Sequence, residues 1–353
     1  MPRRMMLNVA SELCGLHAQV MSSAELTLWA RVEGLGPEAV KKALWKDRSL
    51  VKLWAMRGTL HLLTAADYPT WQAALSTYDH YRRPGWSKYF GVTQPQLEKL
   101  IGAVAHVLED RELTREELAD EVGRRTRSSK LGETLRESWG AVLKPCSFQG
   151  VLCFAPGEGQ RVRFTNPGSW LDLDDRRPDP AHAVSEVFRR FIKSYGPVSR
   201  EELARWWTGV SPAGAEKSIR AMGDEVAPVD IEGTRTWMLA DHLDGLRSAA
   251  PTKAVRLLPA FDQYVIGSTK HAVDLMPGNF RDRVHRTAGW VSPVLAVDGK
   301  LEGVWSHERT GTRLSVTIEP FAKQPPWVRR GAEAEAERLA AHLGGSLELT
   351  WSG

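Results

Sequence analysis

The sequence lacks the features that identify membrane proteins, secreted proteins and several common enzyme classes. No apolar run reaches the roughly 20 residues that a helix needs to cross a bilayer, and Met1 to Asn8 lacks the apolar centre of a secretory signal. P-loop, G-x-G-x-x-G, H-E-x-x-H and G-x-S-x-G motifs are absent as well. We therefore expect a cytoplasmic protein with no membrane partner and no nucleotide cofactor.

Cysteine is scarce too. The 353 residues include three, at Cys14, Cys146 and Cys153. Their number is odd, and their spacing matches neither a disulfide framework nor a zinc site. The sequence therefore predicts buried thiols, no metal ion and no other cofactor.

What is present is the composition of a globular protein with more than one domain. Hydrophobic residues make up 42% and charged residues 25%, which is typical of packed domains. The length suits about two to four small domains. The net charge is only +4, but local runs of arginine and lysine are compatible with a polyanionic partner.

Three helix-start signals recur along the chain. Ser22-Ser-Ala-Glu25, Thr114-Arg-Glu-Glu117 and Ser199-Arg-Glu-Glu202 each match the capping box, in which a hydroxyl and a carboxylate accept hydrogen bonds from free helix amides. The boxes lie roughly 90 residues apart, which suits one small domain per repeat better than a solenoid. We therefore predict three similar units in tandem.

Each unit is predicted to contain helices followed by a β-hairpin. The helices before the second and third boxes are 95–109 and 181–195, and those after the three boxes are 37–47, 131–143 and 212–222. The hairpins are "VKLWAM-RG-TLHLL", "GVLCFA" with "RVRFT", and "VAPVDI" with "TWMLA". Three helices and a hairpin are the plan of a winged helix, whose third helix and wing commonly approach nucleic acid.

From about residue 251 the pattern becomes β-rich. "RLLPAFDQYVIG", "WVSPVLAVDGKLEGVWS" and "RLSVTIEPF" predict strands, with a turn at Asp298-Gly299, and a helix over 326–343 precedes a last strand, "LELTW". The predicted fold class is therefore α+β, with three tandem winged-helix domains and a C-terminal β-rich domain. The predicted domains are residues 1–80, 81–175 (a linker and the second winged helix), 176–248 and 249–353.

His17 and Gln19 stand out in the apolar stretch "GLHAQVMSSAE" before the first box. On a continuous helix, side chains two residues apart point to different faces. If Gly15 ends the preceding helix, both side chains fall in a link between helices, where they can converge on one site. The alternative is structural: Gln19 bonds to amides of the link, and His17 is a core histidine.

Three stretches carry a resemblance to a known family. "LCGLHAQV…LTLWARVEGL", "LWAMRGTLHLLTAADYPTW" and "RLLPAFDQYVIG" resemble the AlkZ-like family of bacterial winged-helix DNA glycosylases, and the similarity covers essentially the whole chain. Family glycosylases carry Gln-x-Gln in the first winged helix, or Gln-x-Asp in a sister branch. By position, His17 replaces the first Gln and Gln19 matches the second. The resemblance implies a substrate of double-stranded DNA bearing alkylpurine adducts, often bulky adducts of natural products, in DNA repair and antibiotic self-resistance.

His17 and Gln19 suit the release of a base that is already cationic. A purine alkylated at N7 leaves readily without a general acid, so an enzyme need only hold the oxocarbenium-like sugar near a positioned water. Gln19 can accept a hydrogen bond from that water and present its carbonyl dipole to the developing charge. Neutral His17 can orient the same water or act as a general base. We therefore predict catalytic roles for both.

Asp262 in "LPAFDQY" is a third catalytic candidate. Its carboxylate can border the catalytic centre, where it holds the water or orients His17. The structural alternative is a buried carboxylate bonded to backbone amides or to an arginine. A lyase-type glycosylase needs a reactive amine, and no lysine stands in a position that fits a Schiff-base nucleophile. We therefore expect a monofunctional DNA glycosylase that hydrolyses the N-glycosidic bond of cationic N7- or N3-alkylated purines without cutting the strand.

Four places carry basic and aromatic side chains suited to DNA contact. They are the first wing, the segment between the first two units, the run before the third helix of the second unit, and a predicted hairpin tip before Gly311. The candidate residues are Arg57, His61, Arg82, Arg83, Lys88, Arg124, Arg125, Arg127, Lys130, His307 and Arg309. Solvated surface is the alternative at the first two places.

The main alternative function is a non-catalytic winged-helix DNA-binding protein, either a regulator or an adduct sensor. His17 in place of Gln favours it, whereas tandem unequal units lack the two-fold symmetry of most dimeric regulators. An unrelated hydrolase on the same scaffold has no motif behind it. We expect a monomer that needs no obligate protein partner and associates with the nucleoid through DNA.

Overall fold

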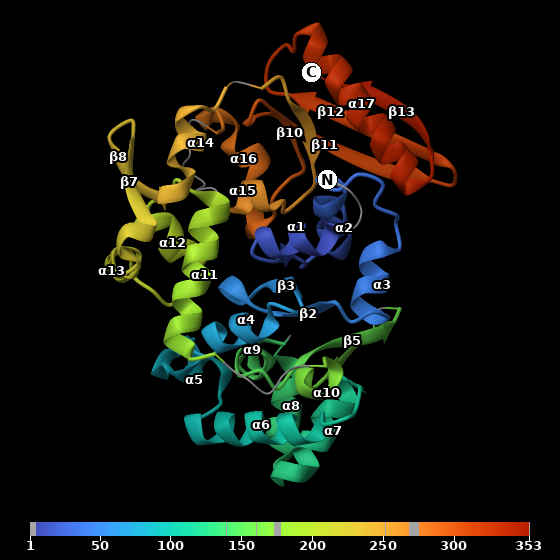
Figure 1. The fold of residues 1–353 in the computed structure, drawn as a ribbon. Helices are drawn as coiled ribbons and strands as arrows, with labels where there is room; N and C mark the ends of the chain where they lie inside the picture. Colours follow the sequence, from blue (N-terminus) through green and yellow to red (C-terminus); the bar gives the residue numbers. More distant parts are fainter. Residues whose placement is uncertain are drawn as a thin grey trace. The chain divides into compact units, whose positions relative to one another are not determined.

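The computed structural model describes residues 5–138, 140–159, 161–172, 178–250, 252–267 and 275–352 (Figure 1). It is a mixed α+β protein, as predicted. Contacts divide the chain into two compact units: unit 1 contains Met1–Val9, Val20–Val40 and His242–Gly353, and unit 2 contains Ala10–Gln19 and Lys41–Asp241. Helices α1 (Met6–Glu12) and α3 (Ala39–Trp45) straddle this division. The domain boundary predicted at residue 175, like the two chain ends, lies outside the described residues.

The first sheet of unit 2 contains the hairpin predicted around Arg57-Gly58. Its antiparallel strands are β1 (Leu16–His17), β2 (Leu50–Trp54) and β3 (Leu60–Thr64), in the order β1-β3-β2, and α4 (Tyr68–Leu75) follows. Arg57 and Gly58 both adopt left-handed backbone, with φ of 58° and 65°. Gly allows this at low cost, so the dipeptide reverses the chain as predicted.

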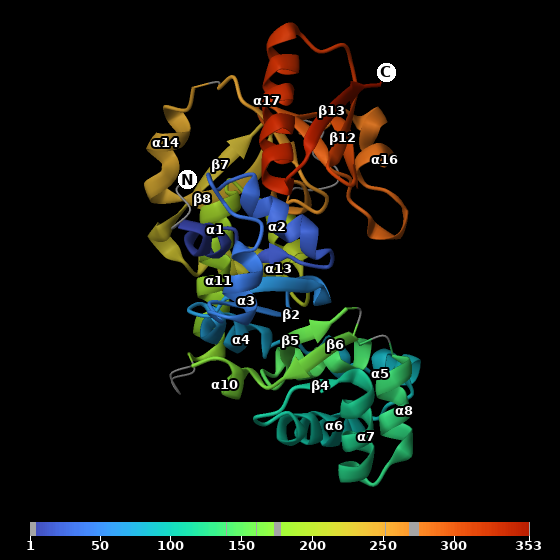
Figure 2. The same cartoon turned by 90° about the vertical axis from the view of Figure 1, so that its right-hand side faces the viewer.

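The middle of unit 2 packs helices beside a second antiparallel sheet (Figure 2). Its elements are α5 (Pro84–Phe90), α6 (Gln94–Val107), β4 (Leu113–Thr114), α7 (Arg115–Thr126), α8 (Ser129–Glu137), α9 (Lys144–Phe148), β5 (Cys153–Glu158), β6 (Arg161–Thr165) and α10 (Pro167–Trp170). The capping box at Thr114 and Glu117 is confirmed. The helix predicted over 131–143 is shorter, because Gly140 adopts φ of 84°, which no α-helix continues through; residue 139 lies outside the described residues.

The last part of unit 2 repeats the order of helices and hairpin. It comprises α11 (Pro180–Tyr195), α12 (Arg200–Trp206), α13 (Pro212–Arg220), β7 (Val226–Ile231) and β8 (Thr234–Leu239). The capping box at Ser199 and Glu202 and the turn at Glu232-Gly233 are confirmed. One continuous hydrophobic core runs through unit 2 and contains all three cysteines as buried thiols, as predicted.

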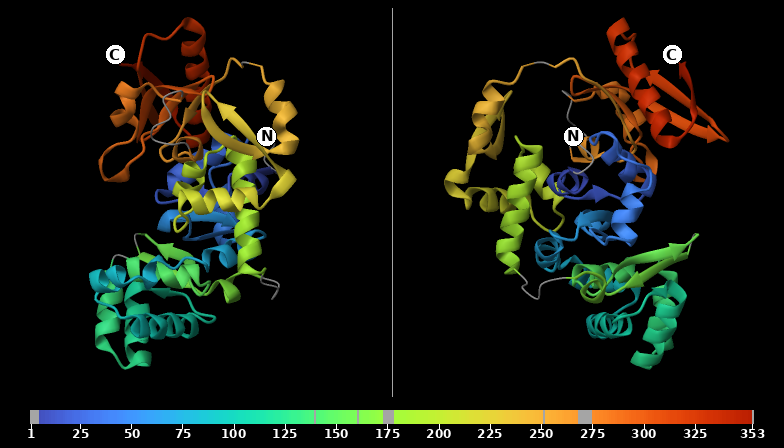
Figure 3. Two further views of the ribbon diagram at one scale, coloured as in Figure 1. Left: turned by 90° about the vertical axis from the view of Figure 1, so that its left-hand side faces the viewer. Right: turned by 45° about the vertical axis from the view of Figure 1, so that its right-hand side comes forward.

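Unit 1 is built on a five-stranded sheet covered by a long helix (Figure 3). The strands β9 (Val255–Leu258), β10 (Val294–Val297), β11 (Lys300–Thr310), β12 (Arg313–Pro320) and β13 (Ser346–Trp351) follow the order β13-β12-β11-β10-β9. The helices are α2 (Met21–Trp29), α14 (Leu243–Arg247), α15 (Gln263–Gly267), α16 (Arg281–Val284) and α17 (Pro326–Leu343). Neighbouring strands are antiparallel except β12 and β13, which are parallel. The predicted helix over 326–343 and the turn at Asp298-Gly299 are confirmed. Among the described helices, none is long and apolar enough to span a membrane.

The capping box predicted at Ser22 is wrong. Helix α2 begins at Met21, and its N-cap is Val20, which has extended backbone and makes no side-chain cap bond. The amide groups of Ser23 and Ala24 instead bond to the Val20 carbonyl. Val20 packs against the apolar cluster of unit 1, so burial of a hydrophobic residue fixes the helix start and leaves Ser22 inside the first turn.

The hairpin tip predicted at His307 to Arg309 is also wrong. These residues belong to β11, where they pair with Val316, Ser315 and Leu314 of β12. The ladder continues to Thr310, and the chain turns at Gly311, where φ is 60°. Backbone pairing with β12 therefore keeps the polar residues His307 to Arg309 in the strand, although their polarity suggested a turn.

Candidate active site

His17 lies in the link between α1 and α2, as predicted, and this link contains the short edge strand β1. After α1, the Gly15 amide bonds to the Ala10 carbonyl at 3.0 Å, and Gly15 has φ of 84°. A Cβ at Gly15 would meet Leu63 Cδ2 at 2.5 Å, so the approach to β3 requires glycine. His17 then pairs with His61 of β3.

Extended backbone has a direct consequence for His17. The ladder continues one residue past β1, because the Ala18 amide donates to the Leu60 carbonyl at 2.7 Å. In a strand, side chains two residues apart leave the same face. The chain bends at Gln19, so strand geometry fixes the side His17 faces but not that of Gln19, and their convergence stays a prediction.

The two side chains differ sharply in exposure. His17 is 8% exposed, and its ring meets His61 edge-to-face with centroids 5.6 Å apart and planes at 80°. The pKa of His17 falls from 6.5 to about 4. Burial is the larger cause, and the positive charge of the nearby Arg57 guanidinium is the smaller one. His17 is therefore neutral at pH 7. Gln19 is exposed, so its amide is open to water.

The turn between β2 and β3, predicted to be the first wing, is partly buried. His61 is 1% exposed, so its side chain offers no surface to DNA, and its Nδ1 lies 3.0 Å from the Thr59 carbonyl. Burial, as the larger cause, and the positive charge of Arg57 hold the pKa of His61 well below 6.5. Arg57 is half-buried, and burial lowers its pKa. These two candidates thus lie with His17 in one electrostatic cluster.

The other basic candidates of unit 2 are exposed. They are Arg82, Arg83, Lys88, Arg124, Arg125, Arg127 and Lys130. Arg82 forms an ion pair with Glu98 at 2.9 Å, and Arg124 forms one with Glu121 at 2.7 Å. Tyr89, next to Lys88 on α5, is 82% exposed, an aromatic surface beside a basic one.

Asp262 lies in unit 1, just after β9, and is fully buried. Its carboxylate accepts hydrogen bonds from Arg31 Nη1 at 2.8 Å and Nη2 at 2.7 Å, and from the Tyr264 amide at 2.9 Å. Two oxygens thus receive three bonds from a bidentate arginine and a backbone amide. This arrangement matches the structural alternative for Asp262.

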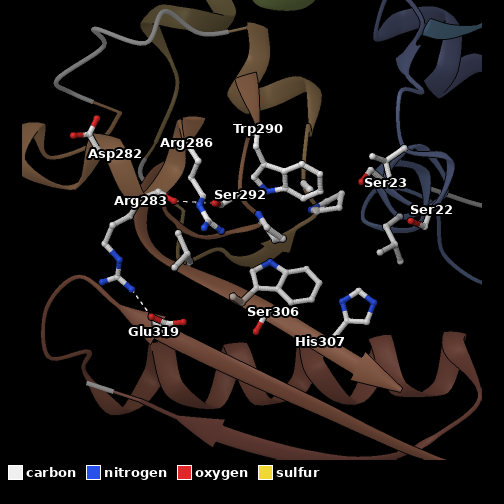
Figure 4. A pocket seen from close by; sticks show the side chains of 17 residues that line it. Ser22, Ser23, Asp282, Arg283, Arg286, Trp290, Ser292, Ser306, His307 and Glu319 are labelled. Carbon is white, nitrogen blue, oxygen red and sulfur yellow. Dashed lines mark hydrogen bonds and ion pairs between the residues drawn. The ribbon is translucent and has the colours of Figure 1, made fainter. Parts of the chain in front are cut away.

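Unit 1 also holds a pocket of about 600 Å³ that the sequence did not reveal (Figure 4). Ser22 and Ser23 of α2 face Arg286, Trp290 and His307 across it. Trp290 is 41% exposed. The only signal in the sequence was the proximity of an arginine and a tryptophan in one short loop, residues 286–290.

The two candidates of β11 have different environments. His307 lines this pocket. The Arg309 guanidinium donates to the carbonyls of Leu343 at 2.7 Å and Gly344 at 3.3 Å, at the end of α17. Arginine at a helix C-terminus satisfies free carbonyls and the negative end of the dipole, so Arg309 stabilises α17.

Comparison with known proteins places the whole chain in one family. The family described as "DNA glycosylase AlkZ-like" matches residues 10–342. A relative from Streptomyces sahachiroi, named "Interstrand DNA cross-link repair glycosylase", is 37% identical over 341 residues, which cover 96% of this chain and 90% of the relative. The solved structure of Streptomyces sahachiroi DNA glycosylase AlkZ matches with a TM-score of 0.90 at 35% identity and covers 98% of this chain and 93% of that one. The chain therefore belongs to the AlkZ-like DNA glycosylase family and is a DNA glycosylase.

Proposed function

We propose that this protein is a monofunctional DNA glycosylase that hydrolyses the N-glycosidic bond of cationic N7- or N3-alkylated purines, bulky adducts included. Family membership over residues 10–342 supports base release from DNA. The name of the Streptomyces relative, an interstrand cross-link repair glycosylase, supports DNA lesions as large as cross-links as substrates and a role in DNA repair. The observation that carries the proposal is a buried, neutral His17 at the end of β1, two residues before an exposed Gln19 in the link to α2.

Gln19 is assigned the main chemical role. A cationic alkylpurine departs as a neutral base, so the barrier lies in the oxocarbenium-like sugar and the approach of water. The Gln19 carbonyl oxygen can accept a hydrogen bond from that water and place its negative dipole end near the sugar. Since the side chain is exposed, a DNA strand can reach it.

His17 is assigned a positioning role. Its pKa of about 4 keeps a ring nitrogen unprotonated at neutral pH, but a group with so low a pKa is a weak base. Water attack on an oxocarbenium-like centre needs little base strength, so a hydrogen bond that aims the water is sufficient. We therefore favour orientation of the water by His17 over removal of its proton.

The catalytic role predicted for Asp262 has weaker support. Its carboxylate is fully buried and occupied by Arg31 and the Tyr264 amide. A carboxylate in this state stabilises local structure. The proposal therefore leaves the reaction to Gln19 and His17.

We assign DNA binding to a monomer with three tandem winged-helix domains and a C-terminal β-rich domain, at residues 1–80, 81–175, 176–248 and 249–353. Support comes from three hairpins, β2–β3, β5–β6 and β7–β8, each preceded by helices. The exposed cations of α5 and of the α7–α8 region supply phosphate contacts. Such binding would hold the protein on nucleoid DNA in the cytoplasm.

The decisive experiment is base release from a duplex that carries one N7-methylguanine or one bulky N7-guanine adduct, followed by alkaline cleavage and a gel. We expect a break at the modified guanine only after alkali. Gln19→Ala should lower the rate about 100-fold or more, as loss of a transition-state dipole does elsewhere, with DNA binding retained. Glu12→Gln, on the exposed end of α1, is the control.

Each other outcome has a definite meaning. Tight binding without a break on either duplex would favour the alternative function, a non-catalytic adduct sensor. A break without alkali would contradict the monofunctional assignment. Equal release by wild type and Gln19→Ala would remove Gln19 from the mechanism.

A further inference from the structure

We propose that the pocket of unit 1 binds a planar aromatic group that carries an oxygen acceptor. The identity of its natural carrier, an adducted guanine in DNA, rests on the proposed function. The observation is the combination of an exposed indole, a fixed aromatic wall and one available guanidinium around about 600 Å³ (Figure 4). That volume falls within the roughly 300–1,000 Å³ of sites that hold organic ligands.

Trp290 is held at the pocket by a tight loop. The Arg286 amide donates to the Trp290 carbonyl at 2.8 Å, and the Trp290 amide donates to the Thr287 carbonyl at 3.2 Å. Ala288 within the loop adopts φ of 56°, a left-handed conformation that is unfavourable for alanine. The indole packs edge-to-face on Phe261, with centroids 5.0 Å apart, yet remains 41% exposed. A rigid, exposed aromatic surface favours stacking because little entropy is lost on binding.

Trp305, the other tryptophan that lines the pocket, is also fixed in place. Trp305 is buried, and its indole Nε1 donates to the Leu258 carbonyl at 2.8 Å. This bond uses the only donor of the side chain, so the indole can offer a ligand only apolar and π surface. His307 stacks on Trp305, with centroids 5.5 Å apart and planes at 29°. The walls therefore favour a flat, unsaturated ligand over a flexible aliphatic one.

The polar side chains of the pocket determine which hydrogen-bonding atoms a ligand must carry. Arg283 is occupied by Glu319 at 2.5 Å, whereas no ion pair of Arg286 is found among the described residues. Figure 4 shows the Arg286 side chain directed toward the interior, with Ser22 and Ser23 opposite it. A guanidinium is a donor with no acceptor capacity, so the ligand must present oxygen or nitrogen acceptors.

Two parts of an adducted guanine can meet both requirements: the guanine ring, and an attached aromatic group that carries an oxygen acceptor. The guanine ring is planar, and when N7 is alkylated O6 remains as an acceptor on that edge. An aromatic group attached by the alkylating agent is the other source. Probes of each kind separate them: N7-methylguanine as the free base, and anthracene-2-carboxylate as a planar aromatic acid without a purine.

Calorimetric titration of the full-length protein with both probes tests the pocket directly. We expect one site, and Trp290→Ala should weaken binding of the preferred probe about 10-fold, as loss of a stacking aromatic does. Trp290→Phe should recover most of that loss, and Arg286→Gln should weaken binding by a similar factor. Trp351→Ala and Arg313→Gln, on β13 and β12, are the controls and should bind like wild type. Thermal melts establish that each variant is folded.

The preferred probe then predicts which lesion depends on the pocket. If anthracene-2-carboxylate binds better, Trp290→Ala should raise KM for an N7-(anthracenylmethyl)guanine duplex more than for an N7-methylguanine duplex. If N7-methylguanine binds better, the increase should be similar for both. Absence of binding by both probes, or equal losses in Trp290→Ala and Trp351→Ala, would overturn the proposal.

The two proposals fail in different ways. Base release without binding of either probe would refute the pocket and leave the glycosylase assignment intact. Probe binding that is lost in Trp290→Ala, with no base release from either duplex, would support the pocket and refute the proposed reaction.

Discussion

Replacement of Asp262 by alanine tests whether its carboxylate is structural or chemical. The carboxylate is fully buried and accepts bonds from Arg31 at 2.8 and 2.7 Å and from the Tyr264 amide at 2.9 Å. Alanine leaves the guanidinium without its counter-charge and the amide without this acceptor. Both groups then carry an uncompensated desolvation cost.

The size of the effect follows from the burial of the pair. Loss of one partner from a fully buried ion pair costs about 3–5 kcal/mol. The Arg31 side chain is 23% exposed, so water restores part of its solvation, and we expect about 2–4 kcal/mol of lost stability. Asp244 is the control, because its pair with Arg247 at 3.2 Å is exposed and should contribute about 0–1 kcal/mol.

Thermal and urea unfolding of wild type, Asp262→Ala and Asp244→Ala measure the difference. A double variant, Asp262→Leu with Arg31→Met, adds a stricter test: since both charges leave together, it should be more stable than Asp262→Ala. A loss no larger than that of Asp244→Ala would refute the structural argument. Base release that disappears from a variant of undiminished stability would assign the carboxylate to the reaction.

Acidity, salt and helix capping provide three further tests. The pKa of His17 is about 4 in the folded protein and 6.5 when the ring is fully solvated in the unfolded chain. Between these pH values the unfolded state binds more protons, so stability is lost as the pH falls. The contribution of His17 to stability, up to about 3 kcal/mol, is complete above pH 6.5 and declines as the pH falls toward 4. Denaturation at several pH values should show a weaker decline in His17→Gln, and base release that rises through an apparent pKa near 6.5 would contradict a neutral His17. In fluorescence anisotropy at increasing salt, Arg125→Ala and Lys130→Ala should each reduce the slope of log affinity against log salt by about 1, and unchanged slopes would place both side chains outside the interface. Thr114→Ala should lower the free energy of unfolding, measured by urea denaturation, by about 0.5–2 kcal/mol because it removes a helix cap. Ser22→Ala should have little effect, because Ser22 makes no cap bond. Equal losses in the two variants would contradict the start of α2 at Met21.

Local signals explain why most elements could be predicted. Helix α17 begins with Pro326 and ends before Gly344, which adopts φ of 71°. A single residue at each end therefore predicts where this helix starts and stops. The turn at Asp298-Gly299 has two left-handed residues, which aspartate and glycine accept more easily than most. The boxes at Thr114 and Ser199 form because hydroxyl and carboxylate lie within one helical turn.

Long-range contacts explain what could not be predicted. The residues at Ser22 match the capping-box pattern as closely as those at Thr114 and Ser199. Helix α2 nevertheless starts at Met21, after Val20, which packs against the apolar cluster of unit 1. The partner of Asp262 is Arg31, 231 residues away, and no local pattern connects them. The pocket of unit 1 likewise combines side chains from α2, the Trp290 loop and β11.

The substitution of histidine for glutamine at position 17 is compatible with a glycosylase because burial changes what the imidazole can be. An exposed histidine would be partly cationic near pH 6.5 and would repel a positively charged sugar and base. Burial beside His61 and the Arg57 charge keep His17 neutral, so the position holds an uncharged side chain with both a donor and an acceptor, as glutamine does. The same burial limits direct access to substrate, which is why we expect Gln19, exposed two residues later, to be the side chain that touches the reacting sugar.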